Sequence, residues 1–201
     1  MNFIVFCAIS LVSAWVCSQV FKTLLNFCTT RTFKLKMLVS DGDFPSTHTT
    51  TSVAAVIVVC YELMPIALNS ASEEIRIIAS SVIVAVALWA AFIIRDALGI
   101  RLRVQELSKT VSRLLTDSQE VEGAPISDNL QEFWTELALG INLKVGHFPH
   151  EVIGGLILGI IFGVGASSLR ASNHLVFMID IAVFVIYTII SFIVVGRKRK
   201  K

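Results

Sequence analysis

Five long stretches without a charged residue constrain this chain more than any other feature. They cover residues 1–21, 44–61, 77–94, 152–169 and 181–196. A helix needs about 20 apolar residues to cross the hydrocarbon core of a bilayer, and each stretch approaches that length with its flanking residues. Hydrophobic residues make up 55% of the chain, above the roughly 45–50% of soluble domains. We therefore predict an all-α integral membrane bundle of about five transmembrane helices, forming one membrane-embedded domain over residues 1–201.

Lysine and arginine are distributed unevenly if the five spans alternate in direction. One side then receives every Lys and Arg except Arg76 and Arg170, including the basic tail at 197–201. Positive residues accumulate on the cytoplasmic side of membrane proteins. We therefore expect the basic face and the C-terminus in the cytoplasm, and the N-terminus outside. The first stretch lacks the basic n-region and cleavage site of a signal peptide, so we expect a retained helix.

The only long segment between spans runs from about 97 to 143. Its first part, "LGIRLRVQELSKTVSRLL", places apolar residues near one stripe, which predicts an interfacial amphipathic helix on an anionic leaflet. The basic residues, largely off that stripe, are Arg101, Arg103, Lys109 and Arg113. Its second part is acidic and predicts a loop followed by a short helix around residues 129–139.

Two stretches that contain histidine each lie at the start of a predicted span. They are "GDFPSTHTTT", residues 42–51, and "GHFPHEVIGG", residues 146–155. In each, a proline is expected in the first helical turn, Pro45 and Pro149. Helix starts offer unpaired N–H groups and the positive end of the helix dipole to an anion. Because alternation also brings Lys22 to this face, the sequence predicts a phosphate-binding site there.

The residue types at this face are those that phosphomonoester hydrolysis requires. One histidine can attack phosphorus and form a phosphohistidine, while another protonates the leaving alkoxide. Lys22 and Arg101 would hold the equatorial oxygens, where charge must be neutralised. Glu151, four residues after His147, suits a carboxylate that fixes the tautomer of the nucleophile. This mechanism needs no metal and no cofactor, and the four cysteines have no metal-ligand spacing.

Four blocks of the sequence carry a resemblance to a known family. In order they are "SAWVCSQVFKTLLN", "GDFPSTHTTT", "RDALGIRLRVQELSK" and "LKVGHFPHEVIGGLILG". They resemble the divergent membrane branch of the type 2 phosphatidic acid phosphatase and vanadium-dependent haloperoxidase superfamily. That branch reads roughly AQxxK, GGMPSSHSA, YDAxGVR and LGHTPxEVxAGxxxG. The resemblance extends over residues 13–163 and implies a membrane phosphatase.

The resemblance implies a role for each matching residue. Lys22 matches a phosphate-binding lysine, Ser46 a phosphate ligand and His48 the general acid toward the leaving group. His147 matches the nucleophile and Glu151 its carboxylate partner, where the wider superfamily has Asp. The additional motif of the branch is matched by Asp96, Gly99 and Arg101.

The chain also departs from the superfamily pattern. Ile141 and Thr29 stand where the wider superfamily has arginines, and Asp43 stands where the branch has glycine. An anion beside a phosphate site is repelled unless a cation or proton offsets it. The cations that can replace the missing arginines are Arg31, Lys34, Arg101 and Lys144.

We predict a membrane phosphomonoesterase acting on a phospholipid or isoprenoid lipid phosphate, such as phosphatidic acid, with membrane lipids and no nucleic acid as partners. The alternative is an inactive relative that binds anionic lipid or a partner protein through its basic face. A small transporter is a third possibility, resting on Asp180 and Glu62 as the only acids inside a span. Gly155, Gly159 and Gly163, spaced four apart, predict close helix packing.

Overall fold

The computed structural model describes residues 2–31, 44–99 and 147–198, together with 103, 104, 106, 107, 110 and 111. Its long helices are α1 (Phe3–Thr30), α2 (Thr47–Asn69), α3 (Glu73–Leu98), α6 (Pro149–Arg170) and α7 (His174–Lys198). All five are long and apolar enough to cross a membrane, and the described part of the chain contains no strand. The predicted all-α membrane bundle is therefore confirmed.

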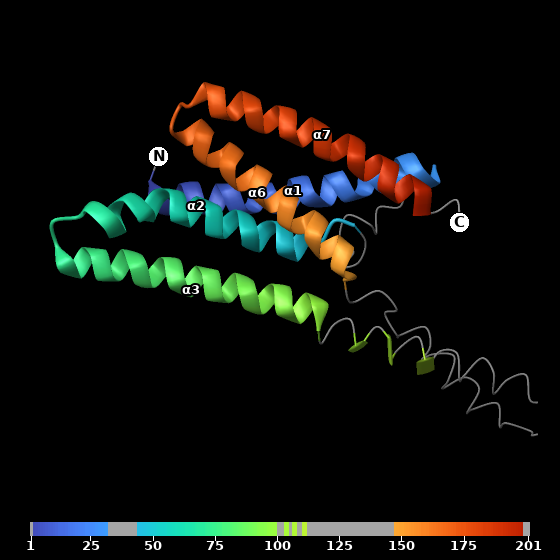
Figure 1. Ribbon diagram of the computed structural model, residues 1–201, viewed down its shortest axis with the longest axis horizontal. Helices are drawn as coiled ribbons and strands as arrows, with labels where there is room; N and C mark the ends of the chain where they lie inside the picture. Colours follow the sequence, from blue (N-terminus) through green and yellow to red (C-terminus); the bar gives the residue numbers. More distant parts are fainter. Residues whose placement is uncertain are drawn as a thin grey trace, which may run out of the picture.

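The helices alternate in direction (Figure 1). Turns at residues 70–72 and 171–173 join α2 to α3 and α6 to α7 at one end of the bundle. The opposite end, which we call the histidine end, contains the last residues of α1 and α3 and the first residues of α2 and α6. There the Ser46 N–H donates to the Glu151 carbonyl oxygen at 2.9 Å, and the His147 N–H donates to the Ala97 carbonyl oxygen at 3.3 Å. These bonds bring the starts of α2 and α6 and the end of α3 together.

Six residues of the predicted interfacial helix are described, and all six are helical. The Arg103 N–H donates to the carbonyl oxygen of Gly99, just after α3, at 3.0 Å. Leu107 is exposed, as a residue facing a membrane surface would be. The remainder of that helix, and the loop and short helix predicted up to residue 139, lie outside the described residues.

The two proline-containing helix starts differ. Pro149 is the first residue of α6, as the sequence predicts. The prediction that Pro45 lies in the first turn of α2 is wrong, because Ser46 is the N-cap and the helix begins at Thr47. The Ser46 hydroxyl oxygen accepts a hydrogen bond from the Thr49 N–H at 3.4 Å, so the capping side chain follows the proline.

Glycines let α6 pack closely against α2. A Cβ atom added to Gly155 would lie 2.5 Å from the carbonyl oxygen of Ser46, and one added to Gly159 would lie 2.6 Å from that of Thr50. A Cβ at Gly163 would lie 2.5 Å from a side chain of α2. The predicted role of these glycines in close helix packing is confirmed. Because each faces α2, they hold the two histidine-bearing helix starts against each other.

Replacing Gly159 by leucine is expected to destabilise the protein by about 1–3 kcal/mol, because the backbone of α2 has to move away from the new side chain. Thermal unfolding of the purified protein in detergent measures this loss. Ile160→Val is the matched control, since Ile160 is the next residue and faces outward. Equal unfolding temperatures for the wild type and Gly159→Leu would contradict the packing.

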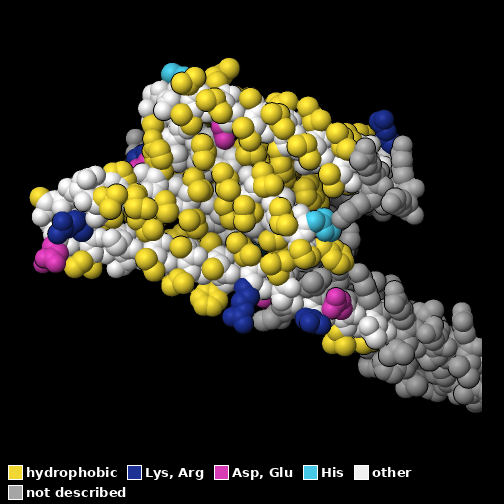
Figure 2. Space-filling view, in the orientation of Figure 1, with side chains coloured by type: hydrophobic (Ala, Val, Ile, Leu, Met, Phe, Trp, Pro, Cys, Tyr) yellow, Lys and Arg dark blue, Asp and Glu magenta, His cyan; other side chains and the backbone are white. Residues whose placement is uncertain are grey.

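The surface of the bundle is mostly hydrophobic, and much of its interior is polar. Figure 2 shows hydrophobic side chains over most of the visible surface of the helices. Phe92 in α3 and Leu175 in α7 are examples of large hydrophobic residues that are exposed. Serine, threonine, glutamine and lysine side chains are among the buried residues. A hydrophobic exterior of this extent matches a lipid environment.

Candidate active site

A layer of buried polar residues lies where α1, α2 and α6 meet at the histidine end. Its members are Ser18, Gln19, Lys22, Thr23, Ser46, Thr47, Thr49, Thr50, Ser52, His147 and Glu151. Burying a polar group without a hydrogen-bond partner is costly, so such a layer needs internal bonds or a polar ligand. The described residues contain no group of three or more His, Cys, Asp and Glu that could hold a metal ion.

His147 is the best-defined side chain of this layer. It lies two residues before α6 and is 1% exposed. Its Nδ1 atom is 3.2 Å from the Glu151 Oε2 atom, which also accepts a hydrogen bond from the Phe148 N–H at 3.0 Å. A carboxylate at Nδ1 favours the tautomer with its proton there, which leaves the lone pair on Nε2. The Nε2 atom is buried and makes no hydrogen bond to any described residue.

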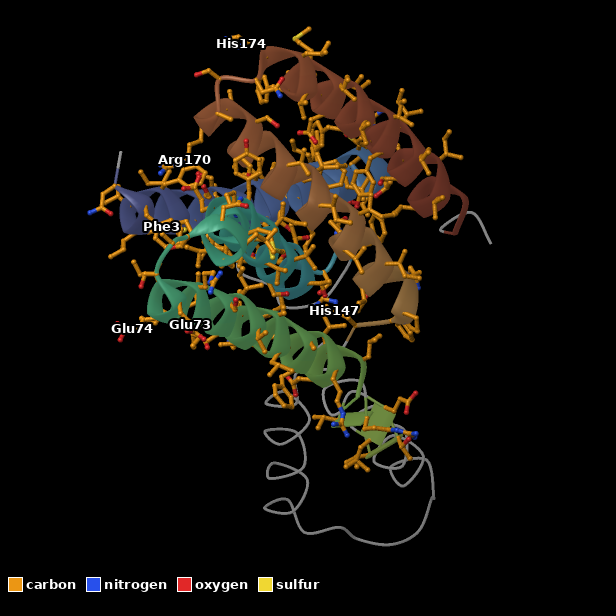
Figure 3. The ribbon with its side chains drawn as sticks, turned by 60° about the vertical axis from the view of Figure 1, so that its left-hand side comes forward. Phe3, Glu73, Glu74, His147, Arg170 and His174 are labelled. Carbon is orange, nitrogen blue, oxygen red and sulfur yellow. The ribbon has the colours of Figure 1, made fainter. Side chains whose placement is uncertain are left out.

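His48 lies close to His147. It is the second residue of α2 and is half-buried. The centroids of the two imidazole rings are 6.3 Å apart, and the ring planes are inclined by 59°. Two imidazoles at this separation can both reach the oxygens or the phosphorus of one phosphate group. Figure 3 places His147 at the end of the bundle where α2, α3 and α6 converge.

Lys22 supplies a buried positive charge on α1. Its exposed fraction is 1%, which is rare for lysine. Ser18, one turn earlier on the same face, donates a hydrogen bond to the Thr47 hydroxyl at 3.3 Å. Lys22 is therefore about 6 Å further along α1 than this contact, toward the histidine end. The buried ammonium group thus lies on the face of α1 that meets the start of α2.

Ser46 connects the two histidine-bearing segments. It is fully buried, and its hydroxyl oxygen accepts a hydrogen bond from the Thr49 hydroxyl at 3.1 Å as well as the capping bond. Its backbone N–H is used by the Glu151 carbonyl oxygen. The hydroxyl hydrogen of Ser46 remains the group that can donate to a phosphate oxygen.

The other predicted site residues are placed differently. Arg31 is exposed and ends α1 in the left-handed region, with φ 58°, so it lies outside the buried layer. Asp96 is half-buried and precedes Ala97, whose carbonyl oxygen accepts the His147 N–H. Arg101 and Lys144 lie outside the described residues, as do Lys34, Asp43 and Ile141.

Two residues of the site region were missed by the sequence analysis. Gln19 is 6% exposed, and its Oε1 atom makes no hydrogen bond within the described ranges. The sequence feature that could have identified it is a glutamine inside an uncharged span, three residues before Lys22. Tyr187 of α7 donates a hydrogen bond from its hydroxyl to the Gly154 carbonyl oxygen at 3.0 Å. No pattern in the sequence predicts that contact.

The sequence matches a known protein family. A family model described as the divergent PAP2 family matches residues 2–162. The chain belongs to the divergent PAP2 family. No curated protein and no solved structure matches it. Membership confirms the resemblance carried by the four sequence blocks. It connects the chain with a phosphatase-related superfamily and suggests phosphorylated lipids as the general class of substrate.

The four blocks of this divergent PAP2 protein meet at the histidine end. The first supplies Lys22 from α1, the second His48 from α2, and the fourth His147 before α6. The third contributes the end of α3, through the Ala97 carbonyl oxygen. The match to the divergent PAP2 family stops before α7, yet α7 packs against α6 and holds its backbone through Tyr187.

Proposed function

We propose that this divergent PAP2 protein hydrolyses a lipid phosphomonoester, such as phosphatidic acid, through a phosphohistidine intermediate. The observation that supports the proposal is the hydrogen bonding of the two ring nitrogens of His147. Its Nδ1 atom is 3.2 Å from a carboxylate, while its Nε2 atom is buried without a hydrogen bond to any described residue. An imidazole oriented in this way is a nucleophile activated by its neighbour.

The reaction proceeds in two steps. The His147 Nε2 lone pair attacks phosphorus, the bond to the lipid oxygen breaks, and His48 gives its proton to the leaving alkoxide. Glu151 stabilises the positive charge that develops on the imidazole. In the second step, water attacks phosphorus while neutral His48 takes a proton from that water. The P–N bond breaks, which releases phosphate and free His147. Lys22 and the Ser46 hydroxyl bind phosphate oxygens in both steps.

The surroundings of the site favour a lipid substrate. The outer surface of the bundle is hydrophobic, and the buried polar layer lies at one end of it. A phosphate head group can enter that end from the interface while its hydrocarbon chains stay in the bilayer. A phospholipid and an isoprenoid phosphate both meet this requirement.

The direct test is phosphate release by the purified protein in phosphatidylcholine nanodiscs. Phosphatidic acid is expected to be dephosphorylated without added metal, and vanadate is expected to inhibit because it resembles the five-coordinate transition state. The wild type, with its fold verified by thermal unfolding, must turn over at least one member of a lipid phosphate panel. Complete inactivity across that panel would reject the proposal.

The competing function is a non-catalytic relative that binds anionic lipid. Thr29 favours it, because this residue stands where the wider superfamily has an arginine, and its hydroxyl donates to the carbonyl oxygens of Leu25 and Asn26 in its own helix. A protein that only binds lipid would bind vesicles containing phosphatidic acid and release no phosphate. Its binding would be unchanged when His48 and His147 are replaced.

Replacing Glu151 by glutamine is expected to lower kcat by on the order of 10²-fold. The amide keeps the size of the side chain but removes the negative charge that stabilises the imidazolium and orients its proton. Glu74→Gln is the matched control, because Glu74 is exposed in the first turn of α3 at the other end of the bundle. If Glu151→Gln kept the wild-type kcat, the Glu151 charge would have no part in the reaction.

The proposal includes an orientation in the membrane. The histidine end and the basic C-terminus face the cytoplasm, following the distribution of lysine and arginine. Labelling of a single cysteine added after Lys201 with a membrane-impermeant reagent tests this. Labelling of this cysteine from outside intact cells would show the opposite orientation.

A further inference from the structure

A cavity lies between α1, α6 and α7. Its volume is about 530 Å³, within the usual range of small-molecule sites. Most of its lining is hydrophobic, and its polar residues are Ser10, Ser13, Arg170 and Asp180. Ile9 and Ile181 also line it and are 52% and 42% exposed, so the cavity is accessible from the side that faces lipid.

This cavity is separate from the histidine site. Arg170, at its polar end, is the last residue of α6, whereas His147 precedes the first, and Figure 3 shows the two at opposite ends of that helix. Phe162 and Phe184 line the cavity with their ring centroids 6.1 Å apart. Phe184 also packs against Phe21 at 6.0 Å. These aromatic rings lie between the cavity and the polar layer.

Asp180 is the acidic residue in the lining of the cavity. Within the described ranges, no hydrogen bond or ion pair joins its carboxyl group to another residue. The Arg170 guanidinium is engaged by Glu62, with a 2.6 Å contact, and lies 4.5 Å from the centroid of the Phe6 ring. The positive charge of Arg170 is therefore balanced by Glu62. No described residue balances a negative charge on the Asp180 carboxyl group.

The half-buried Asp180 carboxyl group packs against the backbone of α6 inside this cavity. A Cβ atom added to Gly165 would lie 2.6 Å from the Asp180 Oδ2 atom, so the carboxyl group rests on a glycine that also lines the cavity. An unpaired carboxylate inside a membrane-spanning helix is costly and marks functional positions. A ligand with a cationic group would remove this cost.

We propose that this cavity binds a long-chain primary amine dissolved in the bilayer. The ammonium group pairs with the Asp180 carboxylate, the Ser10 and Ser13 hydroxyls accept further N–H bonds, and the hydrocarbon chain lies along the apolar lining. Anionic lipids are disfavoured by the Asp180 charge. This amine site is separate from the proposed phosphatase site, and amine binding does not depend on phosphatase activity.

The test uses a photoactivatable long-chain primary amine in phosphatidylcholine nanodiscs that contain the full-length protein. Mass spectrometry is expected to find the label on α1, α6 or α7, and unlabelled tetradecylamine is expected to compete for it. Asp180→Asn should lower the labelling by about tenfold or more, because the partner of the ammonium is lost. Tetradecanol, which has the same chain without the charge, should not compete.

Two further variants make the result specific. Ala166→Phe fills the cavity without changing Asp180, and it should also abolish the labelling. Glu74→Gln removes one exposed carboxylate from the same end of the bundle and should label like the wild type. Thermal unfolding verifies that each variant is folded. The proposal is overturned by equal labelling of Asp180→Asn, by equal competition from tetradecanol, or by cross-links between two copies of the chain in place of ligand labelling.

Discussion

Replacing His147 by alanine is expected to lower phosphate release from phosphatidic acid on the order of 10³-fold or more, because the nucleophile is removed. The same variant should lose the covalent intermediate. With a lipid carrying a radioactive phosphate, rapid quenching in base should trap a phosphohistidine, stable to alkali, in the wild type and none in His147→Ala. Activity and trapping together separate the loss of a nucleophile from a loss of substrate binding.

His150→Ala is the matched control for this prediction. His150 lies in the same helix start, but it is exposed and stacks on Phe148, with ring centroids 5.8 Å apart. Its removal should leave both activity and trapping unchanged. A labelled phosphohistidine in His147→Ala would show that another residue attacks phosphorus.

Replacing His48 by alanine is expected to produce a loss that depends on the leaving group. Hydrolysis of phosphatidic acid should slow by about 10²–10⁴-fold, because the departing alkoxide needs a proton. Hydrolysis of p-nitrophenyl phosphate should slow by about tenfold or less, because its leaving group departs without protonation. The comparison of kcat for the two substrates measures the contribution of the general acid.

His174→Ala provides the reference for this comparison, since His174 is exposed at the start of α7, far from the histidine end. It should not change kcat for either substrate. Equal losses for both substrates in His48→Ala would mean that His48 binds phosphate and does not protonate the leaving group.

The sequence predicts the proximity of His147 and Glu151 because that contact depends on a short-range rule. His147 and Glu151 are four residues apart at a helix start, a spacing that brings the two side chains together within one turn. Ser46 is a residue type that favours the N-cap position, but it was predicted only as a phosphate ligand. The start of α2 was placed too early at Pro45, because proline and serine are both common at helix starts and only the capping bond identifies the cap.

The distance between His48 and His147 could not be obtained in that way. They are separated by about a hundred residues of chain, and their ring separation of 6.3 Å depends on how closely α2 and α6 approach. Gly155 and Gly159 indicate a close contact, but they do not identify the partner helix. The carbonyl oxygens of Ser46 and Thr50 on α2 do so only in the folded bundle.

The sequence by itself determined the five membrane spans and, once these alternate in direction, the residue types at the histidine end. A bilayer requires a fixed length of apolar helix, so each span is visible in its own segment of chain. Only the tertiary structure decided that the His147 Nε2 atom is buried without a hydrogen bond to any described residue, and that Asp180 faces a cavity. Both depend on which side chains other helices bring to these atoms, and a pattern along one helix does not specify its neighbours.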